Sequence, residues 1–465
     1  MTSFLLSKKI SARKGNRIMG RLFGTDGARG VANLELTCET ALNIGRAAAY
    51  VLTREQKHKA KIIIGKDTRI SSDMLESALT AGICSMGADA MLLGTIPTPG
   101  VAFLVREYNA DAGIMISASH NPVEYNGIKI FNRDGFKLPD PIQDEIESII
   151  LDGEPQLPTV IGGELGNVTR CRSAITDYVT HVRQSIDSGV GGIKVAIDCA
   201  NGSASATARE LFGKLDANCR FIHCEPDGVN INKDCGSTHI DELIKYVREN
   251  RCQLGLAFDG DADRCLAVDE KGNLVDGDHL LAIFSKYLKK NGELNGNAVV
   301  GTVMSNMGLS VFARENDIQF VSTAVGDRYV LEEMLEHSYS VGGEQSGHII
   351  FSRYATTGDG QLTGVQLLNI MKRERKPLSE LAAVMPDYPQ VLENVRINDR
   401  TPFAEDPEIM AHITDAEQAL GSDGRVLVRA SGTEPLIRVM LEGKDAELLH
   451  KLAADIADVI RKKRG

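Results

Sequence analysis

The sequence lacks several features that would assign it to a membrane, secreted or nucleic-acid-binding class. It has no tryptophan, 5% aromatic residues and no apolar run of the ~18 residues that a membrane-spanning helix needs. Its nine cysteines include no C-x-x-C pair, which is typical of reduced thiols in a cytosol. A formal net charge of -11 argues against a nucleic-acid backbone as the main partner. We therefore expect a cytoplasmic protein that binds neither membranes nor nucleic acid.

The length and the alternation of strand-like and helix-like segments predict an α/β protein of several domains. A chain of 465 residues is too long for one hydrophobic core. From Gly20 onward, short β-type runs alternate with helical stretches in three similar units, which look like diverged tandem repeats. We predict three related α/β domains and a smaller C-terminal α+β domain around a central cleft, with boundaries at 19–172, 173–276, 277–388 and 389–465.

The first eighteen residues differ from the rest of the chain. They carry five lysines and arginines and no acidic residue, and their apolar patch Phe4–Leu6 is too short for the core of a signal peptide. We interpret residues 1–18 as a disordered basic extension, or as the result of an early start codon with Met19 as the functional start. A basic arm that binds a surface is the alternative.

Each of the three units ends in a polar loop of small residues directly after a predicted strand. The loops are SASHNP (117–122), DGDADR (259–264) and GGEQSGH (342–348). In α/β sheets, functional side chains lie just past the carboxyl ends of strands, so three such loops could converge on one cleft. Ser119 in the first loop is a candidate for a covalently modified nucleophile. The alternative is that its hydroxyl only satisfies a turn, as most loop serines do.

The DGDADR loop is a candidate magnesium site. Asp259, Asp261 and Asp263 alternate with small residues, and an extended backbone would point the three carboxylates the same way. Such close negative charges need a cation between them, and oxygen ligands suit Mg²⁺. An EF-hand does not fit, because Arg264 stands where that loop requires Gly. The D-x-D-x-T/V pattern of aspartyl phosphatases fits poorly, whereas a solvated acidic turn stays open.

Other motifs carry residues suited to a phosphorylated sugar. The segment RASGTEPLIR places Arg429 and Arg438 around a small-residue loop, which indicates an anion site or an ordinary hairpin turn. Glu344 and Ser346 in the third loop suit sugar hydroxyls, although a structural turn explains their spacing nearly as well. Lys129 in GIKIF follows the first loop closely enough to polarise a phosphoryl group or to move a proton.

Eight motifs, taken together, resemble those of a known enzyme family. In chain order they are FGTDGARG, SASHNP with NGIKIF, IDCANG, CGSTH, DGDADR, GGEQSGH, TTGDG and RASGTEPLIR. They resemble the α-D-phosphohexomutase superfamily, and the resemblance extends from Met19 to the C-terminal helix. It implies a heart-shaped molecule whose four domains meet at a deep central cleft. Ala262 stands where the family commonly has Gly, which raises the question whether this backbone needs a positive φ.

The resemblance implies a role for each candidate residue. Ser119 is the residue carried as phosphoserine. The ligands implied for one Mg²⁺ ion are Ser119, Asp259, Asp261 and Asp263. The residues implied in transition-state stabilisation and proton transfer are Arg29, Lys129 and His348. Those implied in binding the sugar and its phosphate are Arg264, Glu344, Ser346, Arg429, Ser431, Gly432, Thr433 and Arg438.

The implied reaction is the reversible conversion of glucosamine 6-phosphate to glucosamine 1-phosphate, which feeds the synthesis of UDP-N-acetylglucosamine and cell-wall precursors. Phospho-Ser119 donates its phosphoryl group to O1 and gives a 1,6-bisphosphate, whose 6-phosphoryl group then returns to Ser119. The resemblance also implies a homodimer, together with priming of the enzyme by a kinase or by glucosamine or glucose 1,6-bisphosphate.

Three alternatives to this reaction stay open at the level of sequence. Gln345 in the GEQSGH form is typical of glucosamine-phosphate enzymes, whereas phosphomannomutase/phosphoglucomutase relatives usually have Met there. An enzyme of that second kind is the first alternative. The others are a catalytically idle protein that binds sugar phosphates or Ca²⁺, and a phosphatase that releases inorganic phosphate.

Overall fold

A computed structural model describes the chain from Leu22 to Gly465, apart from residues 25, 154, 188, 400 and 431–434. The prediction for residues 1–18 lies outside the described residues. Within the described chain, no helix is both long and apolar enough to cross a bilayer.

The first domain is built on a seven-stranded sheet in the order β1-β2-β6-β5-β3-β4-β7. The strands are β1 (Phe23–Gly24), β2 (Gly27–Val31), β3 (Lys61–Lys66), β4 (Asp89–Thr95), β5 (Ala112–Ile116), β6 (Tyr125–Asn132) and β7 (Val168–Arg170). The helices are α2 (Cys38–Thr53), α3 (Ile70–Ser85), α4 (Thr98–Glu107) and α5 (Asp140–Asp152). Because helices pack on both faces, β5 and the middle of β3 between its two terminal lysines are apolar and buried.

The second and third domains each repeat a smaller version of this layout. The second sheet has the order β12-β11-β10-β8-β9, from β8 (Lys194–Asp198), β9 (Asn218–Ile222), β10 (Leu254–Phe258), β11 (Cys265–Asp269) and β12 (Leu274–Val275). The third has the order β14-β13-β15-β16, from β13 (Ala298–Thr302), β14 (Gln319–Thr323), β15 (Val341–Gly343) and β16 (Ile349–Phe351). Their helices are α6 (Ala174–Arg183), α7 (Ala204–Gly213), α8 (Asp241–Asn250), α9 (Gly277–Lys290), α10 (Met307–Glu315), α11 (Asp327–His337), α12 (Gly360–Glu374) and α13 (Leu378–Ala382).

The three sheets share one topological core, which explains where their functional loops lie. In each, the first strand of the repeat pairs in parallel with the next two, and a fourth strand returns antiparallel to the third. The three predicted loops are the connections between the third and fourth strands: β5–β6, β10–β11 and β15–β16. Each loop therefore leaves the carboxyl end of a parallel strand, where α/β sheets keep their binding sites.

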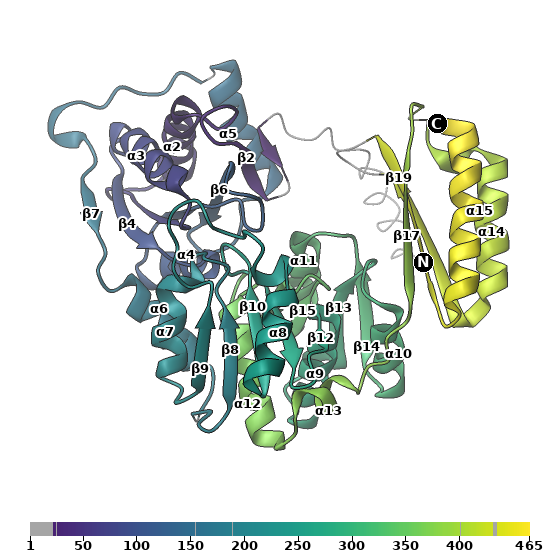
Figure 1. Ribbon diagram of the computed structural model, residues 1–465. Coiled ribbons are helices and arrows are strands. Elements are labelled where there is room, and N and C mark those ends of the chain that lie inside the picture. The colour runs from purple at the N-terminus through teal and green to yellow at the C-terminus, as the bar shows by residue number, and fades with distance from the viewer. Residues whose placement is uncertain (1–21, 25, 154, 188, 400, 431–434) are drawn as a thin grey trace, which may run out of the picture.

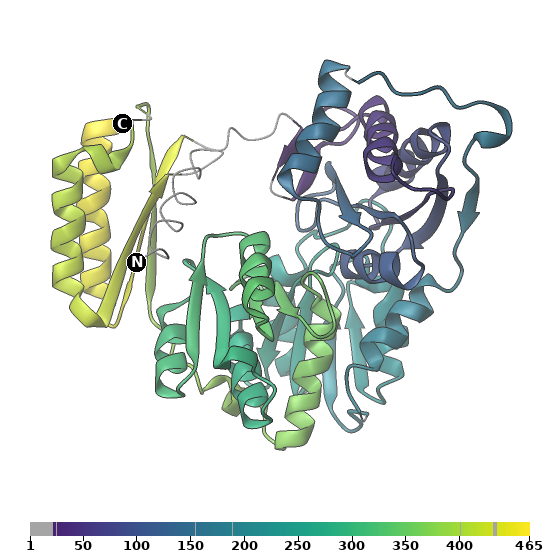
Figure 2. The same cartoon turned by 180° about the vertical axis from the view of Figure 1, so that it is seen from behind.

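The C-terminal domain is a three-stranded antiparallel sheet covered by two helices. Its strands β17 (Gln390–Arg396), β18 (Gly424–Ala430) and β19 (Leu436–Gly443) have the order β17-β19-β18, and its helices are α14 (Pro407–Leu420) and α15 (Ala446–Arg464). Figure 1 shows both helices on the outer side of the sheet, away from the first domain, and Figure 2 shows the same arrangement from behind. The prediction of three α/β domains and a smaller C-terminal α+β domain is confirmed.

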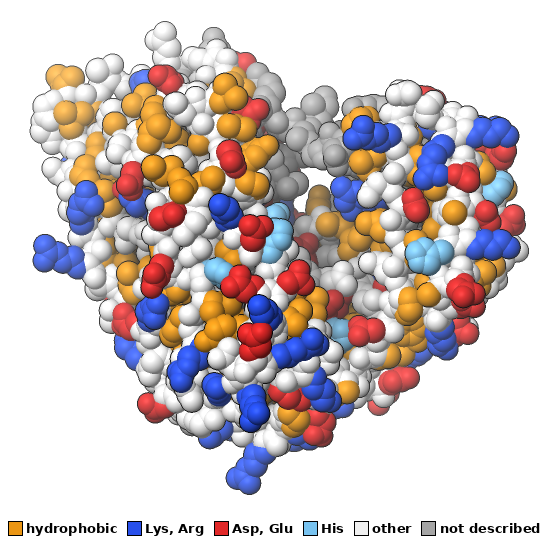
Figure 3. All heavy atoms as spheres, viewed as in Figure 1, with side chains coloured by type: hydrophobic (Ala, Val, Ile, Leu, Met, Phe, Trp, Pro, Cys, Tyr) orange, Lys and Arg blue, Asp and Glu red, His pale blue; other side chains and the backbone are white. Residues whose placement is uncertain are grey.

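The largest hydrophobic core joins the first three domains, whereas the C-terminal domain has a core of its own. One continuous cluster of buried residues extends from α4 of the first domain through the second domain to α13 of the third. The C-terminal domain has a separate cluster between its sheet and its helices. In Figure 3 the surface is hollowed between the first domain and the C-terminal domain, as expected for a central cleft.

Candidate active site

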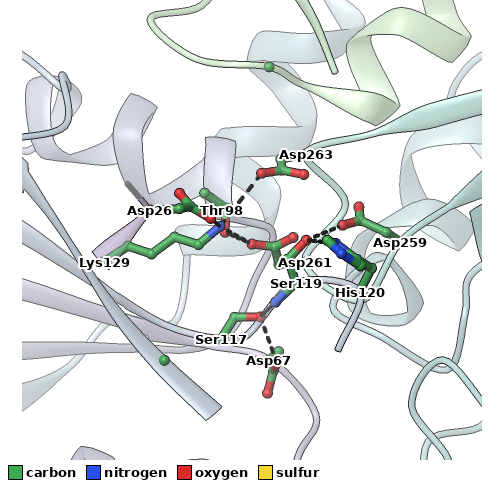
Figure 4. Close-up of polar contacts among 12 residues, drawn as sticks. Asp26, Asp67, Thr98, Ser117, Ser119, His120, Lys129, Asp259, Asp261 and Asp263 are labelled. Atoms are coloured by element: carbon green, nitrogen blue, oxygen red, sulfur yellow. Dashed lines mark hydrogen bonds and ion pairs between the residues drawn. The ribbon is translucent and has the colours of Figure 1, made fainter. Parts of the chain in front are cut away.

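Ser119 lies in the turn between β5 and β6, where its backbone has a φ of 53°. This left-handed conformation is costly for a residue with a Cβ, and strain of this kind is concentrated at functional sites. The side chain points toward the second domain, and its Oγ donates a hydrogen bond of 2.6 Å to Oδ2 of Asp259 (Figure 4). The Oγ is also 3.2 Å from Nδ1 of His120. The structure thus brings the predicted nucleophile against the predicted metal loop.

Arg69 and Asp67 hold the Ser119 loop in this shape. Both lie after β3, the strand next to β5, and form a fully buried ion pair of 2.8 Å. The guanidinium of Arg69 donates to the carbonyl oxygens of Ser119 at 3.0 Å and of Asn121 at 2.7 Å. Asp67 accepts a hydrogen bond of 2.7 Å from Oγ of Ser117, which in turn accepts from the N–H of Ser119. The loop is therefore fixed through its backbone, and the Ser119 hydroxyl stays available.

The second domain holds the same loop from the other side. The side-chain amide of Asn232 donates to the carbonyl oxygen of Ser119 at 2.9 Å and to that of Asn121 at 3.1 Å. Asn232 is buried, and no motif or predicted strand in the sequence pointed to this residue. It joins the serine loop to the second domain.

The three aspartates converge as predicted, but not through the extended backbone that we expected. The loop is a turn rather than an extended segment, and Ala262 within it has a φ of 56°. Position 262 therefore does need the left-handed conformation, which is less favourable for an alanine than for a glycine. Carboxylate oxygens of Asp259, Asp261 and Asp263 nevertheless lie within 4.8 Å of one another.

The aspartate loop fits a divalent cation. All three side chains are buried, and Oδ1 of Asp261 and Oδ1 of Asp263 have no hydrogen-bond partner among the described residues. Burial and the repulsion from these two neighbours raise the pKa of Asp259 well above its usual value. Unpartnered, crowded carboxylate oxygens of this kind are suited to Mg²⁺, which prefers oxygen ligands.

Two other groups of side chains in the described chain have metal-like spacing, but neither lies at the serine. One comprises Asp198, His223 and Cys235, and the other Glu333, Glu336 and His337. Asp198 already accepts hydrogen bonds of 2.9 Å from the N–H groups of Ala200 and Gly236. The Asp259 loop is thus the group whose oxygens need a partner and face the nucleophile.

Lys129 on β6 is a buried cation at the centre of the site. Its Nζ lies 2.8 Å from Asp261, 3.1 Å from Asp26 and 3.6 Å from Asp263 (Figure 4). Although burial lowers the pKa of Lys129, these three carboxylates raise it above its usual value. Lys129 is therefore positively charged at neutral pH. Arg29 on β2, the neighbouring strand, pairs with Asp26 and adds a second positive charge.

A chain of ion pairs links the first domain to the third. Lys137 lies 2.5 Å from Asp26 and 2.6 Å from Asp327 at the start of α11. Asp327 lies 3.7 Å from Nε2 of His348, which is 4.0 Å from Asp263 in the metal loop. The GGEQSGH loop thus reaches the aspartates through His348, and all three predicted loops meet.

The remaining residues of the third loop line the same region. Arg264 ends the second loop, and although burial lowers its pKa, the carboxylates of Asp263, Asp259 and Glu344 raise it. Glu344 accepts a hydrogen bond of 3.2 Å from the N–H of Gly326. Oγ of Ser346 is buried and has no partner among the described residues, so it is suited to a ligand hydroxyl.

The C-terminal domain contributes a pair of arginines. Arg429 on β18 lies directly opposite Arg438 on β19, and burial together with Arg438 lowers the pKa of Arg429. Ile437, Val439 and Leu441 pack against the helices, so by alternation Arg438 faces the other side of the sheet. Figure 1 shows this side turned toward the first domain. Ser431, Gly432 and Thr433 lie outside the described residues.

Sequence reasoning missed several residues that build this site: Asp26, Asp67, Arg69, Thr98, Lys137, Asn232 and Asp327. Thr98 donates a hydrogen bond of 2.6 Å to Asp261. A signal existed for Asp67 and Arg69, because the polar run KDTRISS follows a predicted strand in the way that the three loops do. Lys137 and Asp327 gave no such signal, because their pairing joins residues 190 positions apart.

The sequence pattern of the phosphoglucomutase/phosphomannomutase family matches this chain in four parts. The matches cover α/β/α domain I at residues 20–156, domain II at 176–272, domain III at 276–388 and the C-terminal domain at 392–459. The chain therefore belongs to this family of phosphohexomutases, which are isomerases. The resemblance inferred from the motifs is confirmed.

Within the family, the chain is similar over nearly its whole length to bacterial phosphoglucosamine mutases. It is 55% identical over 449 residues to phosphoglucosamine mutase of Acetivibrio thermocellus, covering 96% of this chain and 100% of that protein. It is 56% identical over 447 residues to phosphoglucosamine mutase of Clostridium novyi, covering 96% and 99%.

Solved structures share the fold at lower sequence identity. A phosphoglucomutase/phosphomannomutase family protein from Burkholderia thailandensis superposes with a TM-score of 0.80 at 24% identity, over 96% of this chain and 98% of that one. N-acetylphosphoglucosamine mutase from Aspergillus fumigatus, solved with GlcNAc-6P and magnesium, superposes with a TM-score of 0.65 at 16% identity, over 99% of both chains.

Proposed function

We propose that this chain interconverts glucosamine 6-phosphate and glucosamine 1-phosphate, with Ser119 as the residue that carries the phosphoryl group. The contact between the Ser119 hydroxyl and Asp259, at 2.6 Å, is the observation that carries the proposal. The choice of an amino sugar is supported by the identity of 55% with phosphoglucosamine mutases. Such a reaction supplies the sugar 1-phosphate from which UDP-N-acetylglucosamine and cell-wall precursors are made.

The reaction transfers one phosphoryl group in each of two steps. The bond from phosphorus to Oγ of Ser119 breaks as phosphorus bonds to O1 of the sugar; the O1 proton passes to a base and the leaving Oγ takes up one proton. The resulting 1,6-bisphosphate reorients, its 6-phosphoryl group returns to Oγ of Ser119 as that hydroxyl loses its proton and O6 gains one, and glucosamine 1-phosphate is released. Phosphoryl transfer of this type depends on positioning and on charge stabilisation.

The charges around Ser119 divide these tasks between residues. Lys129 is held as a cation by Asp26 and Asp261, so it stabilises negative charge on the transferring group rather than accepting a proton. Arg29 adds to this stabilisation, and His348 is the candidate for the proton-accepting group. Asp259, Asp261 and Asp263 would hold Mg²⁺, which neutralises the phosphoryl oxygens when it is bound.

The substrate contacts follow from the same geometry. Arg264, Glu344 and Ser346 would read the sugar hydroxyls at the third loop. The paired arginines of the C-terminal sheet would hold the phosphate that does not react, together with the loop that contains Ser431, Gly432 and Thr433. Because O1 and O6 of the sugar react in turn at one serine, a single phosphate site can serve both orientations.

The proposal also covers the domain boundaries, the cellular location, the oligomeric state and the priming of Ser119. The domains divide at 19–172, 173–276, 277–388 and 389–465. The enzyme acts in the cytoplasm, and it is a homodimer. Ser119 is primed by a kinase or by glucosamine or glucose 1,6-bisphosphate.

A comparison of sugar phosphates tests the proposal. Purified protein with Mg²⁺ and a trace of glucose 1,6-bisphosphate is assayed on glucosamine, glucose and mannose 6-phosphates. We expect the highest kcat/KM on glucosamine 6-phosphate, no release of inorganic phosphate, and loss of turnover after chelation of the metal. A preference for mannose or glucose would replace the amino sugar by the phosphomannomutase/phosphoglucomutase alternative, and free phosphate would indicate a phosphatase.

The variant Ser119→Ala tests the nucleophile separately. Because the phosphoryl carrier is removed, turnover should fall by at least about 10³-fold. Ser77→Ala, at an exposed serine of α3, is the matched control and should keep normal turnover. Normal turnover by Ser119→Ala would refute the phosphoserine mechanism.

A further inference from the structure

Three side chains that can bind a metal ion meet at the end of the second sheet, outside the aspartate loop. Asp198 ends β8, His223 follows the parallel neighbour β9, and Cys235 begins the CGSTH motif. A carboxylate oxygen, a ring nitrogen and the thiol sulfur of these residues lie within 4.8 Å of one another. The fold therefore brings an oxygen, a nitrogen and a sulfur ligand together.

Backbone donors fix the carboxylate of this group. The N–H groups of Ala200 and Gly236 each donate a hydrogen bond of 2.9 Å to Asp198. A carboxylate has about four acceptor positions, so Asp198 keeps lone pairs for a metal ion. Its Oδ2 lies 3.0 Å from Nδ1 of His223. Two ligands about 2.1 Å from a tetrahedral zinc ion are about 3.4 Å apart, so a small shift of the ring would admit the ion.

Glu242, near the start of α8, lies on the other side of the imidazole ring. Its Oε2 is 3.2 Å from Nε2 of His223. A carboxylate that accepts from one ring nitrogen leaves the other nitrogen to bind metal, and this carboxylate–histidine–metal arrangement recurs at zinc sites. The side chains of His223 and Glu242 are 19% and 61% exposed, whereas Asp198 and Cys235 are fully buried. An ion can therefore reach the group from the histidine side.

The buried thiol of Cys235 lies among negative charges. Burial raises its pKa to about 12, together with the carboxylates of Asp198, Glu242 and Asp234, and it makes no hydrogen bond to another described residue. A divalent cation reverses this effect, because a thiol that coordinates a metal ion is deprotonated. With a neutral histidine, the thiolate and the Asp198 carboxylate would balance the two charges of the ion.

We propose that Asp198, His223 and Cys235 bind one zinc ion, with Glu242 orienting the histidine. Sulfur and nitrogen ligands favour Zn²⁺ over Mg²⁺, which prefers oxygen alone. The thiol loses its proton when the ion binds, and so does the imidazole if it is protonated. Three protein ligands leave the fourth tetrahedral position to water. This site uses none of the residues of the aspartate loop, and it does not rest on the proposed mutase reaction.

The zinc site lies at the end of the segment that holds the Ser119 loop. Asn232, three residues before Cys235, donates from its N–H to the carbonyl oxygen of Ala200 and from its side chain to that of Ser119, both at 2.9 Å. Zinc would tie this segment to Asp198 at the end of β8. We therefore expect slower hydrogen exchange over residues 230–236 when zinc is bound.

Cobalt substitution tests the site, because a thiolate bound to Co²⁺ gives a charge-transfer band in the near ultraviolet and oxygen ligands do not. Reduced full-length protein is freed of metal with a chelator and titrated with Co²⁺ in excess Mg²⁺, which competes at the aspartate loop. We expect one equivalent of Co²⁺ to produce the band and one equivalent of Zn²⁺ to remove it. Cys235→Ser should lack the band, whereas Cys252→Ser, at another buried cysteine of the second domain, should keep it.

Glu242→Gln tests the site without removing a ligand or changing the interior. The affinity for zinc, measured by competition with a chelating dye, should fall by about 10- to 100-fold. Glu249→Gln is the matched control, because Glu249 lies on the same helix and its side chain is 62% exposed. Absence of the thiolate band, its persistence in Cys235→Ser, or equal zinc affinities of the two glutamate variants would overturn the site. Zinc binding that leaves hydrogen exchange over residues 230–236 unchanged would overturn its connection to the serine loop.

Discussion

At the scale of single residues, the site combines backbone strain with crowded charge. Ser119 and Ala262 both have left-handed backbones, with φ values of 53° and 56°, on the two loops that meet at the nucleophile. Each side chain is buried, so surrounding contacts compensate for the local cost. Lys129 is enclosed by the carboxylates of Asp261 and Asp263 in the aspartate loop and of Asp26 just before β2. The geometry of the serine and the charge around it are therefore set by neighbours distant in the sequence.

A buried acid away from the site gives a test of charge at this scale. Asp278 near the start of α9 is fully buried, and burial and its neighbour Asp276 raise its pKa to about 7. Its folded pKa lies above the unfolded value of about 3.9, so the native state binds the proton more tightly. This contribution to stability is present below about pH 4 and is lost as the pH rises through 7.

We expect Asp278→Asn to stabilise the protein at pH 8 and to have little effect at pH 4.5. The carbonyl of Asn can still accept the hydrogen bond of 2.7 Å that Asp278 accepts from the N–H of Asn306. Each unit of pKa difference corresponds to about 1.4 kcal/mol. Thermal unfolding of Asp278→Asn and of the unsubstituted protein, measured across this pH range, checks this prediction, with the exposed Asp415→Asn on α14 as control. An equal change in stability at both pH values would contradict it.

At the scale of elements, neighbouring strands bring separate loops together. The loops after β3 and β5 leave the same edge of the first sheet because the two strands are parallel neighbours. Arg69 in the first of these loops donates to carbonyl oxygens in the second, from inside an ion pair with Asp67 that is fully buried. The guanidinium of arginine spreads five N–H donors over a planar fork, whereas the ammonium group of lysine carries three donors on a single nitrogen.

Arg69→Lys should therefore impair the position of Ser119 more than it impairs folding. The charge opposite Asp67 is kept, but the fork that holds the Ser119 and Asn121 carbonyls is lost. Because a misplacement of ~1 Å costs ~10²-fold in rate, we expect kcat to fall by about 10- to 100-fold while KM changes little. Steady-state kinetics and thermal unfolding check this together.

Arg54→Lys is the matched control for that change, because Arg54 at the end of α2 makes a surface ion pair with Glu145. It should leave kcat unchanged. A drop in kcat of Arg69→Lys that is fully explained by unfolded protein at the assay temperature would reject a positioning role.

At the scale of the whole molecule, three domains share one core and are also joined by ion pairs. Lys137 of the first domain bridges Asp26 and Asp327, and Asp327 belongs to the third. Burial raises the pKa of Asp26, but Lys129, Lys137 and Arg29 together hold it well below its usual value. The C-terminal domain has its own core. It contacts the third domain through a hydrogen bond that Glu442 on β19 accepts from the N–H of Met307 on α10.

Lys137→Met should loosen the contact between the first and third domains. It leaves Asp26 and Asp327, both partly buried, facing each other without the shared cation, which lowers the stability of the protein. We expect faster hydrogen exchange at the start of α11 and a fall in kcat/KM. Adding Asp327→Asn should restore part of the lost stability, because the second substitution removes one unpaired charge.

The control for Lys137→Met is Lys290→Met, which breaks an exposed ion pair with Glu374. It should change stability by no more than about 1 kcal/mol. If Lys137→Met exchanges hydrogen at α11 as slowly as the unsubstituted protein, the bridge does not join the domains.

Much of the fold could be predicted because it rests on local patterns. Buried runs such as Ile62–Ile64, closed by polar turns, identified strands and the loops after them, and their repetition predicted three related domains. The convergence of the three loops could also be predicted, because each loop follows the carboxyl end of a predicted strand. The extended conformation assumed for the aspartate loop was wrong, because an alanine does not itself signal a left-handed turn; only the Gly that the family commonly has at this position pointed to a positive φ.

The sequence by itself determined which chemical groups are present and on which loops they lie: a serine after one strand, three aspartates after another, and a carboxylate with a hydroxyl after a third. Only the tertiary structure decided that Arg69 holds the serine loop and that Lys137 joins two domains. The physical reason is the separation along the chain over which each interaction acts. Hydrophobic periodicity and turn propensity act between residues close in the chain, whereas ion pairs and hydrogen bonds across domains form only after the sheets have packed.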